Sequence, residues 1–517
     1  MPSPCLRLAL ALLAVSGAAR SYGAQPERAR GVWGMHRYFA RACLAVATGV
    51  ALSLVGVSGA SASGVASRAV QAALVSSAGT SQATVGPGAQ LWAKLYNGNG
   101  GTGSDADSVA VSPDGKTVFV TGVSGGYATV AYNATTGAQR WVSRYGGSGQ
   151  AVSVAVSPDG STVFVTGGIG AGTFSGFDYA TVAYNAATGA KRWAKLYSGV
   201  GIEGGQALWL AVSPDGKTVF VTGDIGTDNG SQDYATLAYN AATGAQRWVK
   251  SYNGTGKSTD IAYSVAVSPD GKTVFVTGAS TGTSSPLPTS DYATIAYNAA
   301  TGAQKWVKRY NGPVNSGNQA NSVTVSPDGS TVFVTGASGA SGEDYYATIA
   351  YNAATGAQQW VKRYNGGNFG GGAARSMAIS PDGKTVYVTG YLNGATSGAD
   401  YATIAYNAAT GAQQWVKRYN GTGRDDLATS VAVSPGGATV YVTGYSQDTN
   451  DELGYATVAY DAATGAQQWA SRHDGTGTGG GDAFSVAVSS TGTVFVTGVF
   501  RPGTNSPDEY ATIAYHG

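Results

Sequence analysis

The sequence has little cysteine and little histidine. Of 517 residues only two are cysteines, Cys5 and Cys43, and only His473 and His516 lie beyond residue 62. Disulfides, thiolate chemistry and cysteine zinc sites are therefore excluded from residues 63–517. A histidine-ligated zinc site or a Ser-His-Asp triad is poorly supplied for the same reason.

Charged residues are also scarce, at 12 % of the chain, whereas 43 % of the residues are hydrophobic. Disordered chains show the opposite balance, so we expect a folded protein. Residues 1–68 contain seven arginines and one acid, and the rest of the chain has 24 basic and 28 acidic residues, a net charge of −4. Nucleic-acid binding needs a basic surface, so we expect no nucleic-acid partner.

Residues 1–62 have the pattern of an export leader. Basic residues precede the apolar run 43–57, and Ala60-Ser61-Ala62 fits a cleavage site. We expect Met35 to be the true start, a signal peptide over 35–62 and a secreted or cell-surface protein. An uncleaved membrane anchor, and with it a membrane association, is the alternative. Residues 63–88 are rich in Ala, Ser and Gly and predict a flexible linker.

From residue 89 the chain consists of eight similar units. The motif SPDG recurs, with two degenerate copies, and tryptophans recur at spacings of 49 to 58 residues: Trp92, Trp141, Trp193, Trp248, Trp306, Trp360, Trp415 and Trp469. Repeats of this length indicate a solenoid or a propeller. We interpret all eight tryptophans as structural residues that dock one unit on the next.

Each unit predicts four short strands and no helix. In the sixth unit they are 376–380, 384–390, 401–407 and 413–419, joined in pairs by the tight turns SPDGK and NAATGA. Eight four-stranded antiparallel units indicate an all-β, eight-bladed β-propeller over residues 89–517. The lone strands at about 90–96 and at 510–516 would pair and close the ring, and we expect a monomer. Seven closed blades with an irregular eighth remain the alternative.

Three motifs resemble known propeller repeats. DYATIAYNAATGAQQWVKRYNG (400–421) resembles the SBBP-type bacterial repeat, SVAVSPDGKTVFVTG (108–122) is similar to YVTN-type repeats, and AYDAATGAQQW (459–469) is similar to the docking motif of pyrroloquinoline-quinone (PQQ) propellers. The SBBP resemblance implies a secreted or surface protein without a common assigned reaction. Alcohol-oxidising PQQ propellers stack their quinone on a vicinal disulfide, which residues 63–517 cannot form, so the resemblance carries the fold and the docking tryptophan only.

Length variation between the units is confined to one end of the predicted blades. Both tight turns keep their length, whereas the loops between the second and third strands, and between units, vary. We call this the variable-loop end, and functional residues concentrate on such loops. We place 21 of the 28 acidic residues there, against four basic ones, Lys257, Arg375, Arg424 and Arg501. Solvated loops, a cationic partner or Ca²⁺ would each suit this charge, and the candidate Ca²⁺ ligands are Asp224, Asp228, Asp233, Asp448 and Asp451.

A second candidate site is the mouth of the central channel. Every innermost strand has an alanine near its start, followed by a residue that differs in each unit. Eight unlike side chains at one equivalent position would ring the channel, although neutral drift would produce the same variation. The candidate ligand-binding residues are Asp107, Tyr263, Asn321, Arg375 and Phe484.

These observations favour a binding or scaffold module that acts through its acidic variable loops on an extracellular protein or glycan, with Ca²⁺ as an optional ligand. No residue is assigned a catalytic role. An extracellular lyase or glycoside hydrolase using paired carboxylates is one alternative. A PQQ-like quinoprotein without the vicinal cysteines is the other.

Overall fold

The computed structural model describes residues 85–98, 103–170, 177–199, 204–227, 230–283, 289–313, 317–340, 343–366, 371–394, 398–421, 424–474, 480–503 and 507–517. They belong to one compact unit, Thr84–Gly517. The predicted leader over 1–62 and all but the last four residues of the predicted linker lie outside the described residues. Within the described ranges no helix is both long enough and apolar enough to cross a membrane.

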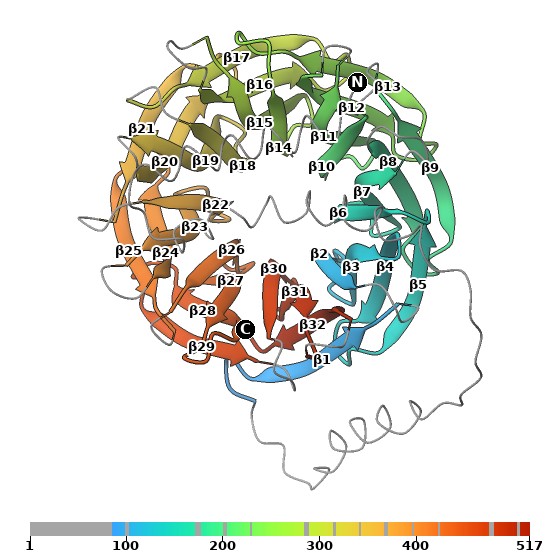
Figure 1. The fold of residues 1–517 in the computed structure, drawn as a ribbon, viewed down its shortest axis with the longest axis vertical. Coiled ribbons are helices and arrows are strands. Elements are labelled where there is room, and N and C mark those ends of the chain that lie inside the picture. Colours follow the sequence, from blue (N-terminus) through green and yellow to red (C-terminus); the bar gives the residue numbers. More distant parts are fainter. Residues whose placement is uncertain are drawn as a thin grey trace, which may run out of the picture. The chain divides into compact units, whose positions relative to one another are not determined.

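Eight four-stranded antiparallel sheets form a ring, which confirms the predicted eight-bladed propeller (Figure 1). We number the blades 1 to 8 in chain order, so that blade 1 contains β2 to β5 and blade 8 contains β30, β31, β32 and β1. In Figure 1 the first strand of each blade lines the centre of the ring and the fourth lies on its outer rim.

The strands occupy equivalent segments of the eight units. The inner strands are β2 (Ser104–Val111), β6 (Gly149–Val156), β10 (Gly205–Val212), β14 (Asp260–Val267), β18 (Asn318–Val325), β22 (Gly372–Ile379), β26 (Asp426–Val433) and β30 (Gly481–Val488). The second strands are β3 (Thr117–Ser124), β7 (Thr162–Gly170), β11 (Thr218–Gly226), β15 (Thr273–Thr281), β19 (Thr331–Ala340), β23 (Thr385–Asn393), β27 (Thr439–Gln447) and β31 (Val494–Phe500).

The two remaining sets complete the blades. The third strands are β4 (Tyr127–Asn133), β8 (Phe177–Asn185), β12 (Gln232–Asn240), β16 (Ser290–Asn298), β20 (Glu343–Asn352), β24 (Ala399–Asn407), β28 (Leu453–Asp461) and β32 (Glu509–Tyr515). The outer strands are β5 (Gln139–Tyr145), β9 (Lys191–Tyr197), β13 (Gln246–Tyr252), β17 (Gln304–Tyr310), β21 (Gln358–Tyr364), β25 (Gln413–Tyr419), β29 (Gln467–His473) and β1 (Gln90–Tyr96).

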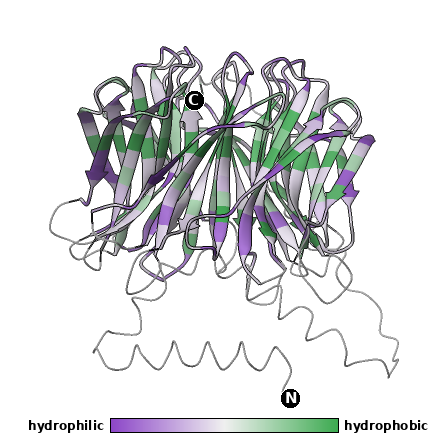
Figure 2. Ribbon diagram, turned by 90° about the horizontal axis from the view of Figure 1, so that it is seen from above, coloured by the Kyte–Doolittle hydropathy of each residue, from purple (hydrophilic) through white to green (hydrophobic). Residues whose placement is uncertain are grey.

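Both tight turns of a blade lie at one end of its strands, as the antiparallel order requires. In blade 1 the first turn is closed by the amide of Gly115, which donates to the carbonyl of Ser112 at 2.8 Å. Gly115 has a φ of +71°, a backbone conformation that glycine adopts without strain. We call this end the tight-turn end, and in Figure 2 it is the upper edge, where the C-terminus also lies.

The ring is closed by the two ends of the described chain, as predicted. β1 pairs with β32, so that the blue strand lies beside the red one in Figure 1. The amide of Gly88 donates to the carbonyl of His516 at 2.7 Å, and the amide of His516 donates to the carbonyl of Ala89 at 2.9 Å. Blade 1 makes the same two bonds within its continuous second turn. The closure therefore rebuilds a tight turn from two separate chain segments.

The predicted docking role of the tryptophans is visible at the junctions. Seven of the eight indole nitrogens donate to an alanine carbonyl of the next blade, as Trp92 does to Ala134 at 2.9 Å. Trp469 finds no hydrogen-bond partner among the described residues, and Gly517 stands where the other blades have the alanine. The indole of Trp469 lies against Gly88 of the rebuilt turn, as the other docking indoles lie against the equivalent glycine of the next blade.

A second ring of bonds joins the blades through buried tyrosines. The tyrosine of each YAT motif donates a hydrogen bond from its hydroxyl to an alanine carbonyl of the next blade. In blade 1, Tyr127 donates to Ala180 at 3.2 Å, and in blade 8, Tyr510 donates to Ala128 of blade 1 at 3.0 Å. Figure 2 shows the hydrophobic residues in the middle of the strands. Eight separate hydrophobic clusters fill the eight junctions. Each blade is therefore stabilised mainly by its two neighbours.

Candidate functional site

Every inner strand contains a β-bulge at the same position. The register slips by one residue after the alanine near the start of the strand, in all eight blades. A bulge leaves its extra residue unpaired and redirects the side chain. The bulged residues are Asp107, Val152, Leu208, Tyr263, Asn321, Arg375, Thr429 and Phe484.

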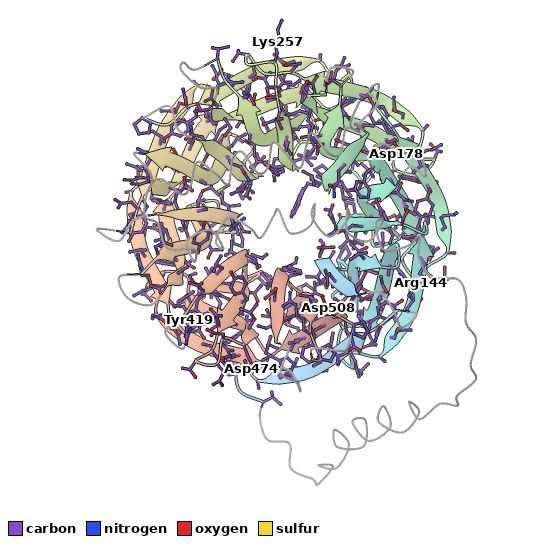
Figure 3. The ribbon with its side chains drawn as sticks, viewed as in Figure 1. Arg144, Asp178, Lys257, Tyr419, Asp474 and Asp508 are labelled. Carbon is purple, nitrogen blue, oxygen red and sulfur yellow. The ribbon has the colours of Figure 1, made fainter. Side chains whose placement is uncertain are left out.

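The bulge position is the one that differs in every unit of the sequence. All eight bulged residues are half-buried, and they sit on the strands that surround the opening of the ring, where Figure 3 shows side chains projecting inward. The structure thus brings the five predicted channel residues to one equivalent place, nearer to the variable-loop end than to the tight turns. Their role in binding stays a prediction.

Two of the bulged residues also donate to a backbone carbonyl of a neighbouring blade. The amide nitrogen of Asn321 donates to the carbonyl of Ala374 at 2.7 Å, and the hydroxyl of Thr429 donates to the carbonyl of Ala483 at 2.9 Å. Both bonds reach the alanine that precedes the bulge in the next inner strand. For Asn321 this contact supplies a structural reason for a polar side chain, independent of any ligand.

Asp107 is the acidic member of the ring. Burial raises the pKa of its carboxyl well above the ordinary value, and the nearby Asp105 raises it further. The side-chain amide of Gln150 in blade 2 lies 3.3 Å from both carboxylate oxygens and opposes the shift. Asp107 is therefore suited to donate as well as accept a hydrogen bond in the channel.

Arg375 is the basic member of the ring. Its guanidinium lies over the ring of Tyr391, 5.6 Å from the centroid, and it makes no ion pair with a carboxylate in the part of the chain that the structure describes. Its charge lowers the pKa of Tyr391 against the stronger effect of burial, which raises it. Arg375 thus offers free hydrogen-bond donors at the channel wall.

Trp209 is a channel residue that the sequence analysis missed. In six blades a serine after the bulge accepts a hydrogen bond from a backbone amide of the next inner strand, at 3.3 to 3.4 Å. Trp209 occupies that position in β10, where it cannot accept this bond, and it is 45 % exposed. The available signal was a tryptophan at a position where the seven other units have serine.

The predicted metal ligands of blade 3 do not converge. Asp224 pairs in register with Tyr234, and Ile225 pairs with Asp233, so the two aspartates are one residue out of step and point to opposite faces of the blade. Asp224 accepts a hydrogen bond from Gln232 at 2.7 Å, and burial raises its pKa to about 7. Asp228 lies outside the described residues.

The predicted ligands of blade 7 are already engaged. Asp448 accepts hydrogen bonds from the amides of Asn450 and Glu452 at 2.8 and 2.9 Å, which lower the pKa of its carboxyl. Asp451 forms an ion pair with Arg424. Among the described residues no three His, Cys, Asp or Glu side chains gather in a way that could hold a metal. Calcium binding stays a prediction from the sequence.

The charge separation between the two ends is smaller than the sequence predicts. Two arginines of the outer strands extend to the variable-loop end, where Arg309 pairs with Asp291 at 2.8 Å and Arg418 with Asp400 at 2.9 Å. The sequence analysis counted only four basic residues at this end, because it could not show the direction of these long side chains. Lys257, in contrast, projects outward from the ring (Figure 3).

Comparison with solved structures supports the fold. Sqt1 from Chaetomium thermophilum, bound to the N-terminus of the ribosomal protein L10, is 13 % identical with a TM-score of 0.53, over 82 % of this chain and 98 % of that one. A quinohemoprotein alcohol dehydrogenase from Comamonas testosteroni is 12 % identical with a TM-score of 0.51, over 83 % and 76 %. BamB from Moraxella catarrhalis is 15 % identical with a TM-score of 0.49, over 83 % and 99 %.

A search of curated proteins finds no match to the chain. The family model described as outer membrane protein assembly factor BamB, built on PQQ-type repeats, matches residues 80–199, 179–340 and 320–499. These matches cover most of the ring, including all eight docking tryptophans and every bulge. The chain therefore belongs to the PQQ-like, BamB-type family of β-propeller repeat proteins.

Proposed function

We propose that this propeller is a binding module that holds a protein partner at the variable-loop end of its channel, and that it acts outside the cytoplasm. The observation that carries the proposal is the coincidence of the β-bulge with the one inner-strand position that differs in all eight units. A repeat that only needs to pack gains nothing from eight different residues at eight identical bulges, whereas a binding site needs distinct side chains.

The chemistry of the site suits a protein segment. Arg375 offers unpaired donors, Asp107 offers a carboxyl with a raised pKa, and Trp209 offers an exposed indole. Tryptophan and arginine are the side chains most often found at the energetic centre of protein interfaces. Sqt1, which has the same fold, was solved bound to the N-terminus of a ribosomal protein, which shows that a propeller of this architecture can hold a protein terminus.

The proposed location of the protein outside the cytoplasm rests on its sequence. The export leader predicted over 1–62 would deliver the ring to the cell surface or the medium, and a BamB-type family is compatible with the cell envelope. Accessibility of an epitope tag on intact cells, compared with a variant lacking residues 35–62, would check this part of the proposal separately.

The test uses substitutions that the chain itself makes at equivalent positions. Trp209→Ser restores the residue found in seven blades, and Arg375→Thr copies the bulge residue of blade 7. Partners cross-linked to the full chain on intact cells would be identified by mass spectrometry, purified, and titrated against wild type and the double variant, with Ca²⁺ and with a chelator. We expect the double variant to bind roughly tenfold more weakly or worse.

Stability provides the control. Trp209→Ser should leave the melting temperature unchanged or raise it, because the serine accepts an inter-blade hydrogen bond at six other junctions. A partner that binds the double variant as tightly as wild type would refute a site at the channel.

A further inference from the structure

The residue that precedes each docking tryptophan divides the tight-turn end into two halves. It is basic in four consecutive blades, 1 to 4, and uncharged in the other four. The basic residues, which we call the basic arc, are Arg140, Arg192, Arg247 and Lys305. The uncharged residues are Gln359, Gln414, Gln468 and Leu91.

The side chains of the arc are exposed and held in one geometry. Arg140 donates from a terminal nitrogen to the carbonyl of Lys116 at 3.2 Å, at the end of the first tight turn. Arg192 and Arg247 make the same bond in blades 2 and 3, at 3.0 and 3.1 Å, and Lys305 donates to a threonine hydroxyl of its own blade at 2.6 Å. Each arginine keeps its other donors for solvent or a partner.

The glutamines of the other half occupy the same place. Gln359, Gln414 and Gln468 each accept a hydrogen bond from the threonine that begins the second strand of their blade, at 3.2 to 3.3 Å. The fold therefore accepts a neutral side chain here with equal ease. Packing alone does not explain why four neighbouring blades carry a positive charge.

The nearby aspartates interact mainly within their own turns and only weakly with the arc. In blade 1, Asp114 accepts hydrogen bonds from the hydroxyl of Ser112 at 2.6 Å and the amide of Lys116 at 3.0 Å, and its second oxygen lies 3.8 Å from the Lys116 ammonium. The serine bond is the main cause of the lowered pKa of Asp114. Asp215 and Asp270 are held in the same way with lysines of their own turns. No member of the arc has an ion pair within 4 Å among the described residues.

A groove opens beside the first member of the arc. It has a volume of about 330 Å³ and lies between blades 1 and 2, bounded by Arg140, the turn 112–114, Asp159 with Gly160, and the turn 186–187. A side chain of a partner could enter it while the flanking chain follows the arc.

We propose that the basic arc binds an acidic segment of a second protein, at the opposite end of the ring from the channel site. The turn aspartates lie in the first tight turns of the same blades, between the inner and second strands, and the ring as a whole is acidic. Nucleic-acid phosphates, with one charge per ~1.7 Å of duplex, would meet these aspartates. Carboxylates on alternate residues of an extended peptide are ~6.8 Å apart, so such a peptide brings fewer negative charges past the aspartates than a duplex does.

The test measures binding of a fluorescently labelled oligoglutamate peptide by anisotropy, at low and at physiological salt. The main variant is Arg140→Gln, Arg192→Gln, Arg247→Gln and Lys305→Gln, which makes blades 1 to 4 resemble blades 5 to 7. We expect binding to weaken roughly tenfold or more in the variant, and to weaken with salt in wild type. The melting temperature of the variant should stay unchanged, because glutamine at this position accepts a hydrogen bond from the first threonine of the second strand in three blades.

The reverse variant, Gln359→Arg, Gln414→Arg and Gln468→Arg, should tighten peptide binding by extending the arc. Equal peptide binding by wild type and the four-glutamine variant would overturn the proposal, as would the absence of binding to wild type. A short DNA duplex serves as the second probe, and tighter binding of DNA than of peptide through the same four residues would also overturn it. Trp209→Ser should leave peptide binding unaffected, which separates this proposal from the channel site.

Discussion

The eight blades share one backbone but fill a buried position beside the variable loops in two different ways. In blades 1, 4, 5 and 7, the polar blades, the first residue of the inner strand is polar and faces a serine of the second strand: Ser104 with Ser124, Asp260 with Ser280, Asn318 with Ser338, and Asp426 with Ser446. In blades 2, 3, 6 and 8, the apolar blades, it is glycine and faces a large apolar residue: Gly149 with Ile169, Gly205 with Ile225, Gly372 with Leu392, and Gly481 with Phe500.

Volume explains why the two residues change together. A Cβ added to Gly372 would lie 2.3 Å from the carbonyl oxygen of Tyr391 and 2.5 Å from Leu392, so a side chain there and a large residue opposite exclude each other. In the polar blades the side chain fills that space and satisfies a backbone amide. Asp260 accepts from Gly254 at 2.6 Å, and Asp426 accepts from Gly421 at 2.9 Å.

The outer strand follows the same division. All four polar blades carry an arginine at the penultimate position of the outer strand, whereas the apolar blades have Leu196, Ser251 and Leu95 there, with Arg418 as the exception. In blade 4, Arg309 donates to the hydroxyl of Ser280 at 2.7 Å and to its carbonyl at 2.9 Å. The polar arrangement thus involves the inner, second and outer strands. The apolar arrangement involves only the inner and second strands, and the outer-strand leucines Leu95 and Leu196 stay 51 % and 54 % exposed.

Gly372→Asp should have the largest effect, because it inserts a carboxylate against Leu392 and a backbone carbonyl. Overpacking and an unpaired buried charge together should lower the free energy of unfolding by about 4 kcal/mol. Urea unfolding followed by tryptophan fluorescence would measure it. The matched control is the double variant with Leu392→Ser, which copies blade 7 and should recover more than half of the loss. A double variant as unstable as the single one would contradict the idea that these two positions must change together.

Asp426→Asn tests the charge of the polar pair. Burial raises the pKa of Asp426 to about 6 in the folded protein, above its unfolded value of about 4. The folded state therefore holds more protons between these values, and this group's contribution to stability is full below about pH 4 and is lost as the pH rises through 6. Asparagine does not ionise, so the variant does not lose this stability as the pH rises. Its free energy of unfolding should therefore increase by about 2 kcal/mol relative to that of wild type between pH 4 and pH 7.5.

Blade 5 supplies the precedent for this substitution. Asn318 accepts from Ser338 at 2.7 Å and donates to the carbonyl of Ser290 at 3.2 Å, and Ala399 offers the equivalent carbonyl next to Asp426. The melting temperatures of both proteins across this pH range would measure the gain, and Asn318→Asp should show the opposite trend. A stability difference between wild type and Asp426→Asn that does not change with pH would contradict a buried carboxylate with a raised pKa.

Arg472→Leu removes the arginine from polar blade 7. Arg472 donates to the carbonyl and hydroxyl of Ser446 at 2.7 and 2.9 Å. Its loss should lower the free energy of unfolding by about 1 to 2 kcal/mol, because a buried acceptor loses its partner. Thermal unfolding would measure this, with Arg472→Lys as the control, which should recover part of the loss since it cannot make both bonds in the same geometry. An unchanged melting temperature would show that the arginine does not support the pair.

The sequence was sufficient for the repeating framework of strands and turns. Tight turns of fixed length, tryptophans at regular intervals and strands left over at both ends predicted the blade count, the docking and the closure. The eight Tyr-to-Ala bonds were not predicted, since nothing in the motif YAT shows where its hydroxyl points. The bulges were missed for a similar reason, although Asp107 and its equivalents were singled out by their variation, and their role in binding stays a prediction.

Features that depend on side-chain direction required the structure. The charge count left Arg309 and Arg418 out of the variable-loop end, because an outer-strand position does not tell which way a long side chain extends. The paired exchange at Gly372 and Leu392 is present in the sequence, but the two residues are 20 positions apart and only the register shows that they face each other. Trp209 was hidden among ten tryptophans because eight of them have a structural role.

Leu196→Arg should have the smallest effect and sharpens the comparison most. It adds the arginine of the polar blades to apolar blade 2, where Ile169 replaces the serine that would accept its hydrogen bonds. With no acceptor, the free energy of unfolding should change by less than about 0.5 kcal/mol, as at other exposed positions. Adding Gly149→Asp and Ile169→Ser to Leu196→Arg should produce a stable polar blade, whereas the same two changes with Leu196 retained should be about 1 to 2 kcal/mol less stable. Leu196→Arg alone could instead stabilise the protein as strongly as Arg472→Leu destabilises it. That result would show that the arginine acts independently of the buried pair, and it would contradict the role assigned here to the serines of the polar blades.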